Sequence, residues 1–352
     1  MRVLLVGDYP PPHGGVAVHV KQVHDFLLSR GVESLVLDIG KGGRPAPDVI
    51  PVRTPTQYGR KLSGFLREGW TVHVHTSGNN PKSWMLAATA GVHARAPRVI
   101  TLHSGLIPDY LASSLARRAF ARVALAGYNR VVAVSEAVHE ALARCGIPEE
   151  KLVMYPAFCA SQVRPGPVPP AVEVARARRK TLLAVAHHPS PVYGRRLVFR
   201  ALRLLSESLP GVGLAVFGPG TRSEEFDRDA REFGVVDLLE NLGELEHPQA
   251  LALMKRCDGF LRPTTHDGDA ISVREALTLG VPCVASDVCT RPEGTWTFKG
   301  GNAVDLADQV LKALRSERRQ VVSPDAGPVL LAMYGELVCQ PTFRGDETHA
   351  TQ

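Results

Sequence analysis

The chain has 352 residues, 44% hydrophobic and 22% charged, which is enough for two domains of about 150 residues each. The net charge of +6 suits an anionic partner, but the basic residues are not interleaved with stacking aromatics, which argues against nucleic acid. No apolar run approaches the roughly 20 residues of a membrane span, and the six cysteines are scattered, so we expect a cytoplasmic protein with reduced cysteines.

The first half alternates apolar runs of strand length with helical patterns, which indicates a doubly wound α/β domain. The expected strands are 3–7, 34–37, 71–75, 98–102 and 130–134. The expected helices are 16–30, 81–95, 111–126 and 135–145.

A Pro-rich and then basic stretch, 164–180, interrupts this alternation and predicts a linker between two Rossmann-like domains, 1–163 and 181–327. Strands are expected at 181–186, 213–217, 236–239, 259–262 and 281–286, with helices at 194–208, 223–233, 248–257 and from Ser272 to Gly280. A last helix at 328–340 precedes a frayed tail, 341–352.

Two acids eight positions apart, Asp267 and Glu275, flank a loop-to-helix junction in the second half. Ser272 is a candidate N-cap, so the backbone N–H groups of 268–271 would be free to meet an anion, aided by the helix dipole. The same Ser272 and Glu275 also fit a capping box, in which the acid only bonds back to the helix start. The residues alone leave both interpretations open.

Other candidate binding residues follow predicted strands, at the edge where open α/β sheets present functional groups. Gly14 and Gly15 precede the first helix, His103 ends strand 98–102, and Gly218 follows strand 213–217. Glycines there allow close approach of a phosphate, but tight turns also use glycine, and a lone histidine is often structural.

In order and spacing, these segments resemble the retaining family 4 glycosyltransferases, which have the GT-B fold. The resemblance implies two Rossmann-like domains with an interdomain cleft and a C-terminal helix that crosses back to the first domain. It also implies that His103 and Asp267 face the donor sugar and that Glu275 binds the ribose. The remaining donor-binding residues that it implies are Gly14, Gly15, Gly218, Gly268, Asp269, Ala270 and Ile271.

One segment departs from the family pattern. Alignment through Gly194 places His188 and Tyr193 where an Arg and a Lys usually hold the donor phosphates. A titratable imidazole and a neutral phenol should bind a diphosphate more weakly. We expect Arg195 or Arg196 to compensate, although both could instead face solvent.

The sequence therefore predicts a retaining glycosyltransferase of the hexosyltransferase type, which moves a sugar from a UDP- or GDP-linked donor to a saccharide or lipid-linked hydroxyl, with neither metal nor cofactor. A basic helix-like segment, 111–130, could lie on anionic lipid on the inner face of the membrane or pack with a solvated basic face. Two alternatives stay open: a GT-B sugar-nucleotide epimerase, and a non-catalytic binding partner in polysaccharide assembly. A dinucleotide oxidoreductase is disfavoured, because neither half has the glycine fingerprint followed by an acid.

Overall fold

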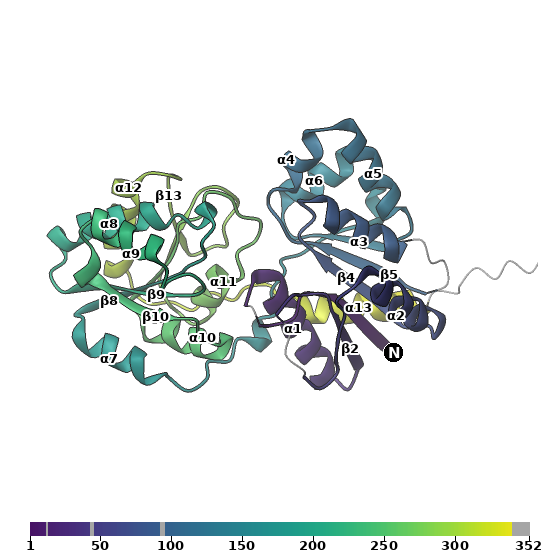
Figure 1. Ribbon diagram of the computed structural model, residues 1–352, viewed down its shortest axis with the longest axis horizontal. Helices are drawn as coiled ribbons and strands as arrows, with labels where there is room; N and C mark the ends of the chain where they lie inside the picture. The colour runs from purple at the N-terminus through teal and green to yellow at the C-terminus, as the bar shows by residue number, and fades with distance from the viewer. Residues whose placement is uncertain (12, 43–45, 92–95, 340–352) are drawn as a thin grey trace, which may run out of the picture.

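The structure is a computed structural model that describes residues 1–11, 13–42, 46–91 and 96–339, and it contains two α/β domains side by side (Figure 1). The first holds a seven-stranded sheet in the order β3-β2-β1-β4-β5-β6-β7, with every neighbouring pair parallel. Its strands are β1 Arg2–Gly7, β2 Glu33–Asp38, β3 Val49–Pro51, β4 Thr71–Thr76, β5 Arg98–Leu102, β6 Arg130–Ala133 and β7 Leu152–Met154. Its helices are α1 Gly15–Ser29, α2 Pro55–Arg67, α3 Pro81–Gly91, α4 Ile107–Ala112, α5 Leu115–Ala126 and α6 Glu136–Arg144.

The second domain repeats the plan with a six-stranded parallel sheet in the order β10-β9-β8-β11-β12-β13. Its strands are β8 Thr181–Ala186, β9 Val212–Phe217, β10 Leu239–Gly243, β11 Gly259–Arg262, β12 Cys283–Ser286 and β13 Thr295–Phe298. Its helices are α7 Pro170–Arg178, α8 Arg195–Ser208, α9 Glu224–Glu232, α10 His247–Arg256, α11 Ile271–Thr278 and α12 Ala303–Arg315.

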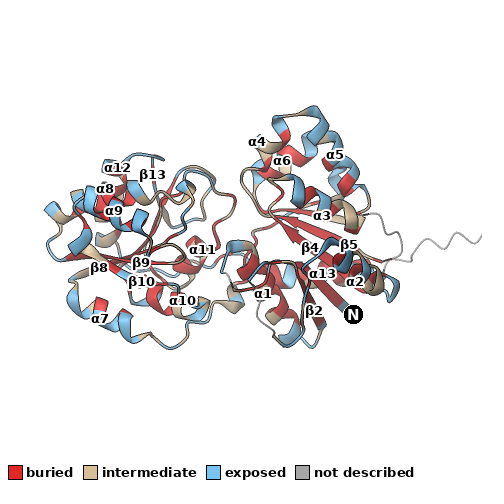
Figure 2. Ribbon diagram, viewed as in Figure 1, coloured by how far each residue is buried: buried red, intermediate tan, exposed pale blue. Residues whose placement is uncertain are grey.

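Each sheet is buried on both faces by its helices, which is why strands such as β1, β5 and β8 are apolar without alternation (Figure 2). The middle strand of the first sheet, β4, alternates valine with threonine and histidine but is buried throughout. In both sheets the strand order reverses direction beside the first strand, between β1 and β4 and between β8 and β11. Ligands of doubly wound sheets bind outside the carboxyl ends of the strands at such a point. The topology thus directs the search for a site to the loops after these strands.

The last helix, α13 Ala326–Cys339, returns to the first domain, which confirms the expected crossover. Leu330 and Tyr334 are fully buried against the first sheet, and Gly327 lies so close to Phe26 of α1 that an added Cβ would be 2.7 Å from its ring. The chain passes between the domains twice, and the two connecting segments are hydrogen-bonded to each other, since Ala326 N donates to Phe158 O at 2.7 Å. The second domain is therefore tied to the first by two covalent connections.

Several expected elements differ from those observed. The helix expected at 111–126 is divided between α4 and α5, because the backbone of Ser114, at the N-cap position of α5, is extended (φ −164°). The expected linker 164–180 contains α7, whose Val172 and Ala175 are fully buried in the second domain. The strand expected at 236–239 is a 3-10 turn, Val236–Leu238, followed by β10.

The helices α2 and α12 and the short strands β3, β7 and β13 were not anticipated. The end of the helix expected at 81–95 and the tail 341–352 lie outside the described residues.

Candidate functional site

The candidate site lies where loops at the carboxyl ends of both sheets meet. The backbones of these two loops are in van der Waals contact. A Cβ added to Gly105 would lie 1.9 Å from the carbonyl oxygen of Asp267, and one added to Gly268 would lie 2.7 Å from that of His103. Only glycines permit this approach. The loop after β5 and the loop before α11 thus form one interdomain contact.

Asp267, in the loop after β11, is held by two arginines. Its carboxylate accepts from Arg262 Nε at 3.0 Å and Nη2 at 3.1 Å, from Arg291 Nη1 at 2.9 Å and from Thr264 Oγ1 at 3.0 Å. Burial would raise the pKa of Asp267, but Arg262 and Arg291 lower it to about 2. The residue is a fixed anion whose oxygens already have partners, and its contact with a donor sugar stays a prediction.

Glu275, in α11, is buried at the boundary between the domains with 3% of its surface exposed. Its Oε1 accepts from His247 Nε2 of α10 at 2.6 Å and from Gln22 Nε2 of α1 at 3.4 Å. Burial lowers the pKa of His247 and Glu275 raises it, with a net increase. The carboxylate expected to bind the ribose therefore sits in a polar cluster built by both domains.

The capping-box interpretation of Glu275 is wrong. The N-cap of α11 is Ala270 and makes no side-chain hydrogen bond, while the buried Ser272 Oγ has no partner within the described part of the chain. Glu275 consequently points away from the helix start and toward α1 and α10. This result removes the capping box as the explanation of Glu275, and its ribose contact stays a prediction.

The residues between these acids complete the interdomain surface. Asp269 pairs with Arg274 Nε at 2.7 Å, and burial raises the pKa of Asp269 despite that partner. Ile271 packs with Val18 and Phe158 of the first domain, and Ala270 is buried. Asp269 thus has an ion-pair partner and Ile271 an apolar one, so donor binding by Gly268, Asp269, Ala270 and Ile271 stays a prediction.

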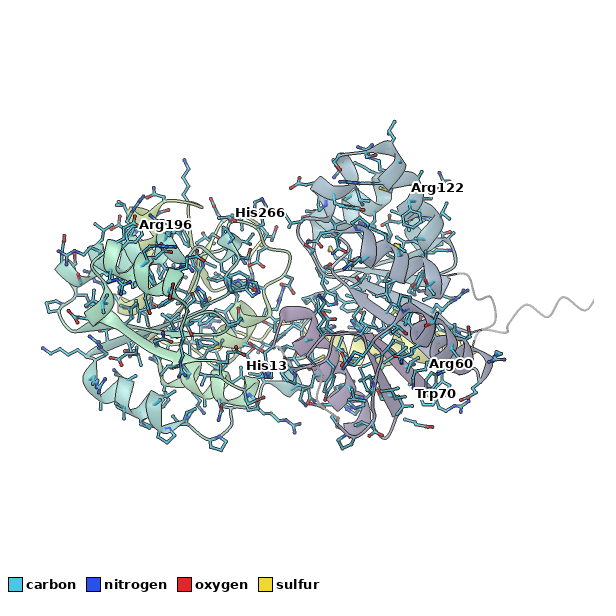
Figure 3. The ribbon with its side chains drawn as sticks, in the orientation of Figure 1. His13, Arg60, Trp70, Arg122, Arg196 and His266 are labelled. Carbon is cyan, nitrogen blue, oxygen red and sulfur yellow. The ribbon has the colours of Figure 1, made fainter. Side chains whose placement is uncertain are left out.

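The loop after β1 reaches the second domain at α10. His13 Nε2 lies 2.9 Å from Glu246 Oε2, and His13 stands at the boundary between the domains (Figure 3). Gly14 is the N-cap of α1 and Gly15 its first residue; both are exposed, and a Cβ on either would meet no atom within 4 Å. Their missing side chains therefore relieve no contact within the described protein, and donor binding by Gly14 and Gly15 stays a prediction.

His103 follows β5 and belongs to a cluster of four histidines. Its Nε2 lies 3.3 Å from His75 Nδ1, and its ring centroid lies 5.3 Å from that of His19. His73 bonds Thr101 and Tyr334, which links the cluster to α13. The sequence identified His103 from its place at a strand end, but its three histidine neighbours became visible only in the fold.

The structure also shows the contacts of the residues that depart from the family pattern, within 187–196. His188 is exposed and its Nδ1 accepts from Ser190 N at 3.0 Å, while the Tyr193 ring lies under the Arg262 guanidinium at 5.1 Å. Arg195 bonds Asp229 at 2.6 Å and Glu225 at 2.5 Å. Arg195 would have to leave these α9 acids to reach a phosphate, so its compensating role stays a prediction.

Arg196 faces solvent, with 52% of its side chain exposed, and pairs there with Asp229 and Glu232 of α9. Gly218 requires glycine for geometric reasons, since its φ is +124° and an added Cβ would lie 2.3 Å from His187 O. Its position beside a nucleotide stays a prediction.

Sequence reasoning did not place Gln22, His247, Arg262 or Arg291 among the site residues, although each bonds one of the two acids. Arg262 ends β11, and that strand-end position was the signal available for it, whereas Arg291 lies in the loop between β12 and β13. No sequence pattern around Gln22 or His247 indicates that they contact Glu275. Across the described ranges, no group of three or more His, Cys, Asp or Glu residues is arranged to hold a metal ion, and no helix has the length and apolarity of a membrane span.

Two family models match the chain: "Glycosyltransferase Family 4" over residues 13–158 and "Glycosyl transferases group 1" over residues 172–324. The chain is 28% identical over 312 residues to the 2-deoxystreptamine N-acetyl-D-glucosaminyltransferase of Streptomyces fradiae, covering 76% of this chain and 73% of that one. It is 24% identical to the GDP-mannose-dependent alpha-(1-6)-phosphatidylinositol monomannoside mannosyltransferase of Mycolicibacterium smegmatis, covering 87% and 85%.

Among solved structures, Anabaena HepE in complex with UDP and glucose superposes with a TM-score of 0.70 at 17% identity, covering 96% of this chain and 98% of that chain. At that identity the likeness shows the fold alone. Together with the two parallel sheets and the returning helix, it shows the GT-B architecture.

Proposed function

The chain belongs to the GT-B glycosyltransferases of the family 4 type, and we propose that it transfers a hexose from a UDP- or GDP-linked donor to a saccharide or lipid-linked hydroxyl with retention of configuration. The observation that carries the proposal is the meeting of His103–Gly105 and Asp267–Glu275, from different domains, at the carboxyl ends of their sheets. A donor held there contacts both domains at once. The retention of configuration rests on the family resemblance.

In this proposal, Glu275 accepts hydrogen bonds from the ribose hydroxyls, and its present donors, His247 and Gln22, hold the carboxylate in place. The backbone amides of 268–271 face the diphosphate, and Gly14–Gly15 approaches it from the first domain without side chains to obstruct it. Fixed dipoles that face the leaving diphosphate stabilise the charge that develops as the sugar departs. No metal is required for that role.

The donor is tested by thermal shift with UDP, GDP and their glucose and mannose conjugates, because a ligand of the native state raises its unfolding temperature. We expect one nucleotide series to stabilise the wild-type chain. Glu275→Gln should weaken that binding by about tenfold or more, the loss expected for a hydrogen bond to a charged group. Glu173→Gln, in an exposed pair with Arg256 far from the site, should bind normally.

Stabilisation by no nucleotide sugar would overturn the proposed function. Undiminished binding by a folded Glu275→Gln variant would remove only the ribose assignment. Transfer of the sugar to an acceptor, followed by NMR assignment of the anomeric centre in the product, then tests both turnover and retention. Binding without transfer to any acceptor would favour the non-catalytic alternative.

We also propose that α5 brings the enzyme to an anionic membrane that carries a lipid-linked acceptor. Leu115, Phe120 and Val123 are 79%, 42% and 72% exposed on this helix, and Arg117 and Arg122 flank them. Arg122 lies on the outer side of the first domain, away from the second domain (Figure 3). An exposed apolar stripe bordered by arginines suits the boundary between lipid head groups and acyl chains.

Co-sedimentation with phosphatidylglycerol vesicles tests this contact. The wild-type chain should pellet with these vesicles and not with phosphatidylcholine vesicles, and a Leu115→Ser, Val123→Ser double variant should stay in the supernatant. Val304→Ser, which changes a valine of the second domain that is 59% exposed, is the control and should pellet normally. Equal pelleting of all three proteins would exclude α5 as the membrane contact.

A further inference from the structure

Four histidines lie together at the carboxyl end of the first sheet: His19 on α1, His73 and His75 on β4, and His103 after β5. The ring centroid of His75 lies 5.6 Å from that of His103 and 5.4 Å from that of His19. Burial, and then the neighbouring histidines, keep the pKa of His75 and His103 well below its ordinary value. Both rings are therefore neutral, and each carries one N–H and one lone pair.

The hydrogen bond between His75 Nδ1 and His103 Nε2, 3.3 Å long, couples the two tautomers because only one of these nitrogens can be the donor. If His103 donated from Nε2, the proton of His75 would sit on its own Nε2. That atom is buried and has no partner in the described part of the chain. A buried N–H without an acceptor is rarer in folded proteins than a buried acceptor without a donor, which is what His75 Nε2 becomes when His75 donates from Nδ1.

The other arrangement avoids that orphan donor. With its proton on Nδ1, His75 donates to His103 Nε2, and His103 must then carry its proton on Nδ1. No hydrogen bond from His103 Nδ1 is formed within residues 1–11, 13–42, 46–91 and 96–339. This N–H is the one polar group of the His103 ring left for a ligand.

His73 cannot take over this role. Its Nδ1 pairs with the Tyr334 hydroxyl and its Nε2 with Thr101 Oγ1 at 2.8 Å, so both ring nitrogens are occupied. His19 contacts the His103 ring edge-on at 5.3 Å between centroids, and neither of its ring nitrogens has a hydrogen-bond partner in the described part of the chain. His75 is thus the histidine placed to set the protonation pattern of His103.

We propose that His75 is a positioning residue that fixes His103 as the Nδ1–H tautomer, so that His103 presents a hydrogen-bond donor to a hydroxyl oxygen of the donor sugar. The sugar contact rests on the proposed function, whereas the tautomer does not. The same arrangement would discriminate against a sugar that lacks an acceptor oxygen at this position, because the His103 N–H would then be left unpaired.

The tautomer is measured directly by long-range 1H–15N correlation NMR of the histidine rings, with His103→Asn used to assign the His103 signals. The wild-type chain should show His103 protonated at Nδ1. His75→Asn should preserve this pattern, since an Asn amide can place an N–H where His75 Nδ1 stood, whereas His75→Leu should convert His103 to the Nε2–H form or a mixture. His24→Asn, which removes a buried histidine bonded to Ser34 elsewhere in the domain, should change nothing.

A wild-type His103 protonated at Nε2, or an unchanged tautomer in a folded His75→Leu variant, would overturn the proposal. If His75→Leu fails to fold, a wild-type His103 protonated at Nε2 still overturns the proposal.

Calorimetry with UDP-glucose and UDP, or the GDP pair if that series binds, separates the sugar contact from the nucleotide contact. In His75→Leu, the gain in affinity of the nucleotide sugar over the nucleotide alone should fall by about tenfold, the effect of one neutral hydrogen bond. His75→Asn should restore this gain. Affinity for the nucleotide alone should be unchanged. If the wild-type chain binds no nucleotide sugar, the proposed function fails while the tautomer result stands; if it binds and His75→Leu loses nothing, the positioning role fails.

Discussion

Replacing Asp267 by Asn should destabilise the second domain strongly, because this carboxylate is the one anion shared by Arg262 and Arg291. The side chains of Asp267, Arg262 and Arg291 are 9%, 15% and 3% exposed, so water would compensate little for the lost charge. Asn would also turn an N–H group toward one of the guanidinium groups. Two buried cations would then face an amide.

The magnitude follows from the pKa of Asp267, which folding lowers from 3.8 to about 2. That difference corresponds to about 2.5 kcal/mol of stability at neutral pH. The loss in the variant should exceed it, approaching the 3–5 kcal/mol typical when one member of a buried ion pair is removed. Because the folded pKa is depressed, this stability is present above pH 3.8 and disappears as the pH falls toward about 2.

Urea unfolding at neutral and acid pH, followed by circular dichroism, tests both the size of the stability loss and its pH dependence. Asp267→Asn should lower the free energy of unfolding by about 3 kcal/mol or more at neutral pH, and the difference from wild type should shrink as the pH falls toward 2. Glu173→Gln breaks a pair whose members are 48% and 47% exposed and should cost less than about 1 kcal/mol. An equally small loss in Asp267→Asn, or a difference independent of pH, would refute the reasoning.

Three further predictions concern the domain boundary and the returning helix. The pKa of His247 is raised in the fold, so the stability that its pair with Glu275 contributes should be fully present below pH 6.5 and lost as the pH rises through the folded pKa. His247→Gln should remove this pH dependence of the unfolding temperature, and an unchanged pH profile would contradict the role of His247 in it. Gly105→Ala should force the domains apart and abolish tight donor binding, because its Cβ would lie 1.9 Å from a backbone oxygen, and small-angle scattering should show a larger radius of gyration. Gly64→Ala, whose Cβ would meet no atom within 4 Å, is the control, and normal donor affinity in Gly105→Ala would exclude the close contact. Tyr334→Phe should cost about 1–3 kcal/mol in urea unfolding, since it leaves a buried imidazole nitrogen unpaired, and a loss below that range would mean that the bond contributes little.

Much of the fold was predictable because it depends on local patterns. Apolar runs of strand length located the central strands of both sheets, and their alternation with helical periods indicated two doubly wound domains. The strands missed by this reasoning are β3, β7 and β13 at sheet edges, which have only three or four residues and no room for a pattern.

The helix α12 could have been found, since Asn302 caps it through Val304 N and Asp305 N, and its buried positions recur at helical spacing. The helix α7 was obscured by the prolines before it, because Pro at the first helical turn starts a helix as readily as it breaks one. Both cases show a start signal that was present in the sequence.

The α/β alternation, the strand-end position of His103 and the spacing of Asp267 and Glu275 could be read from the sequence, since each depends on residues near one another in the chain. The partners of these side chains became known only from the fold. Glu275 meets Gln22, 253 positions away, and His73 meets Tyr334, 261 positions away. Such pairs form because the fold packs helices that are far apart in the chain, α1 against α11 at the domain boundary and α13 against the first sheet. No local pattern encodes which side chains will meet there. For that reason the spacing of the two acids indicated a site, whereas their charge state and their remaining freedom to bind a ligand became apparent only from the fold.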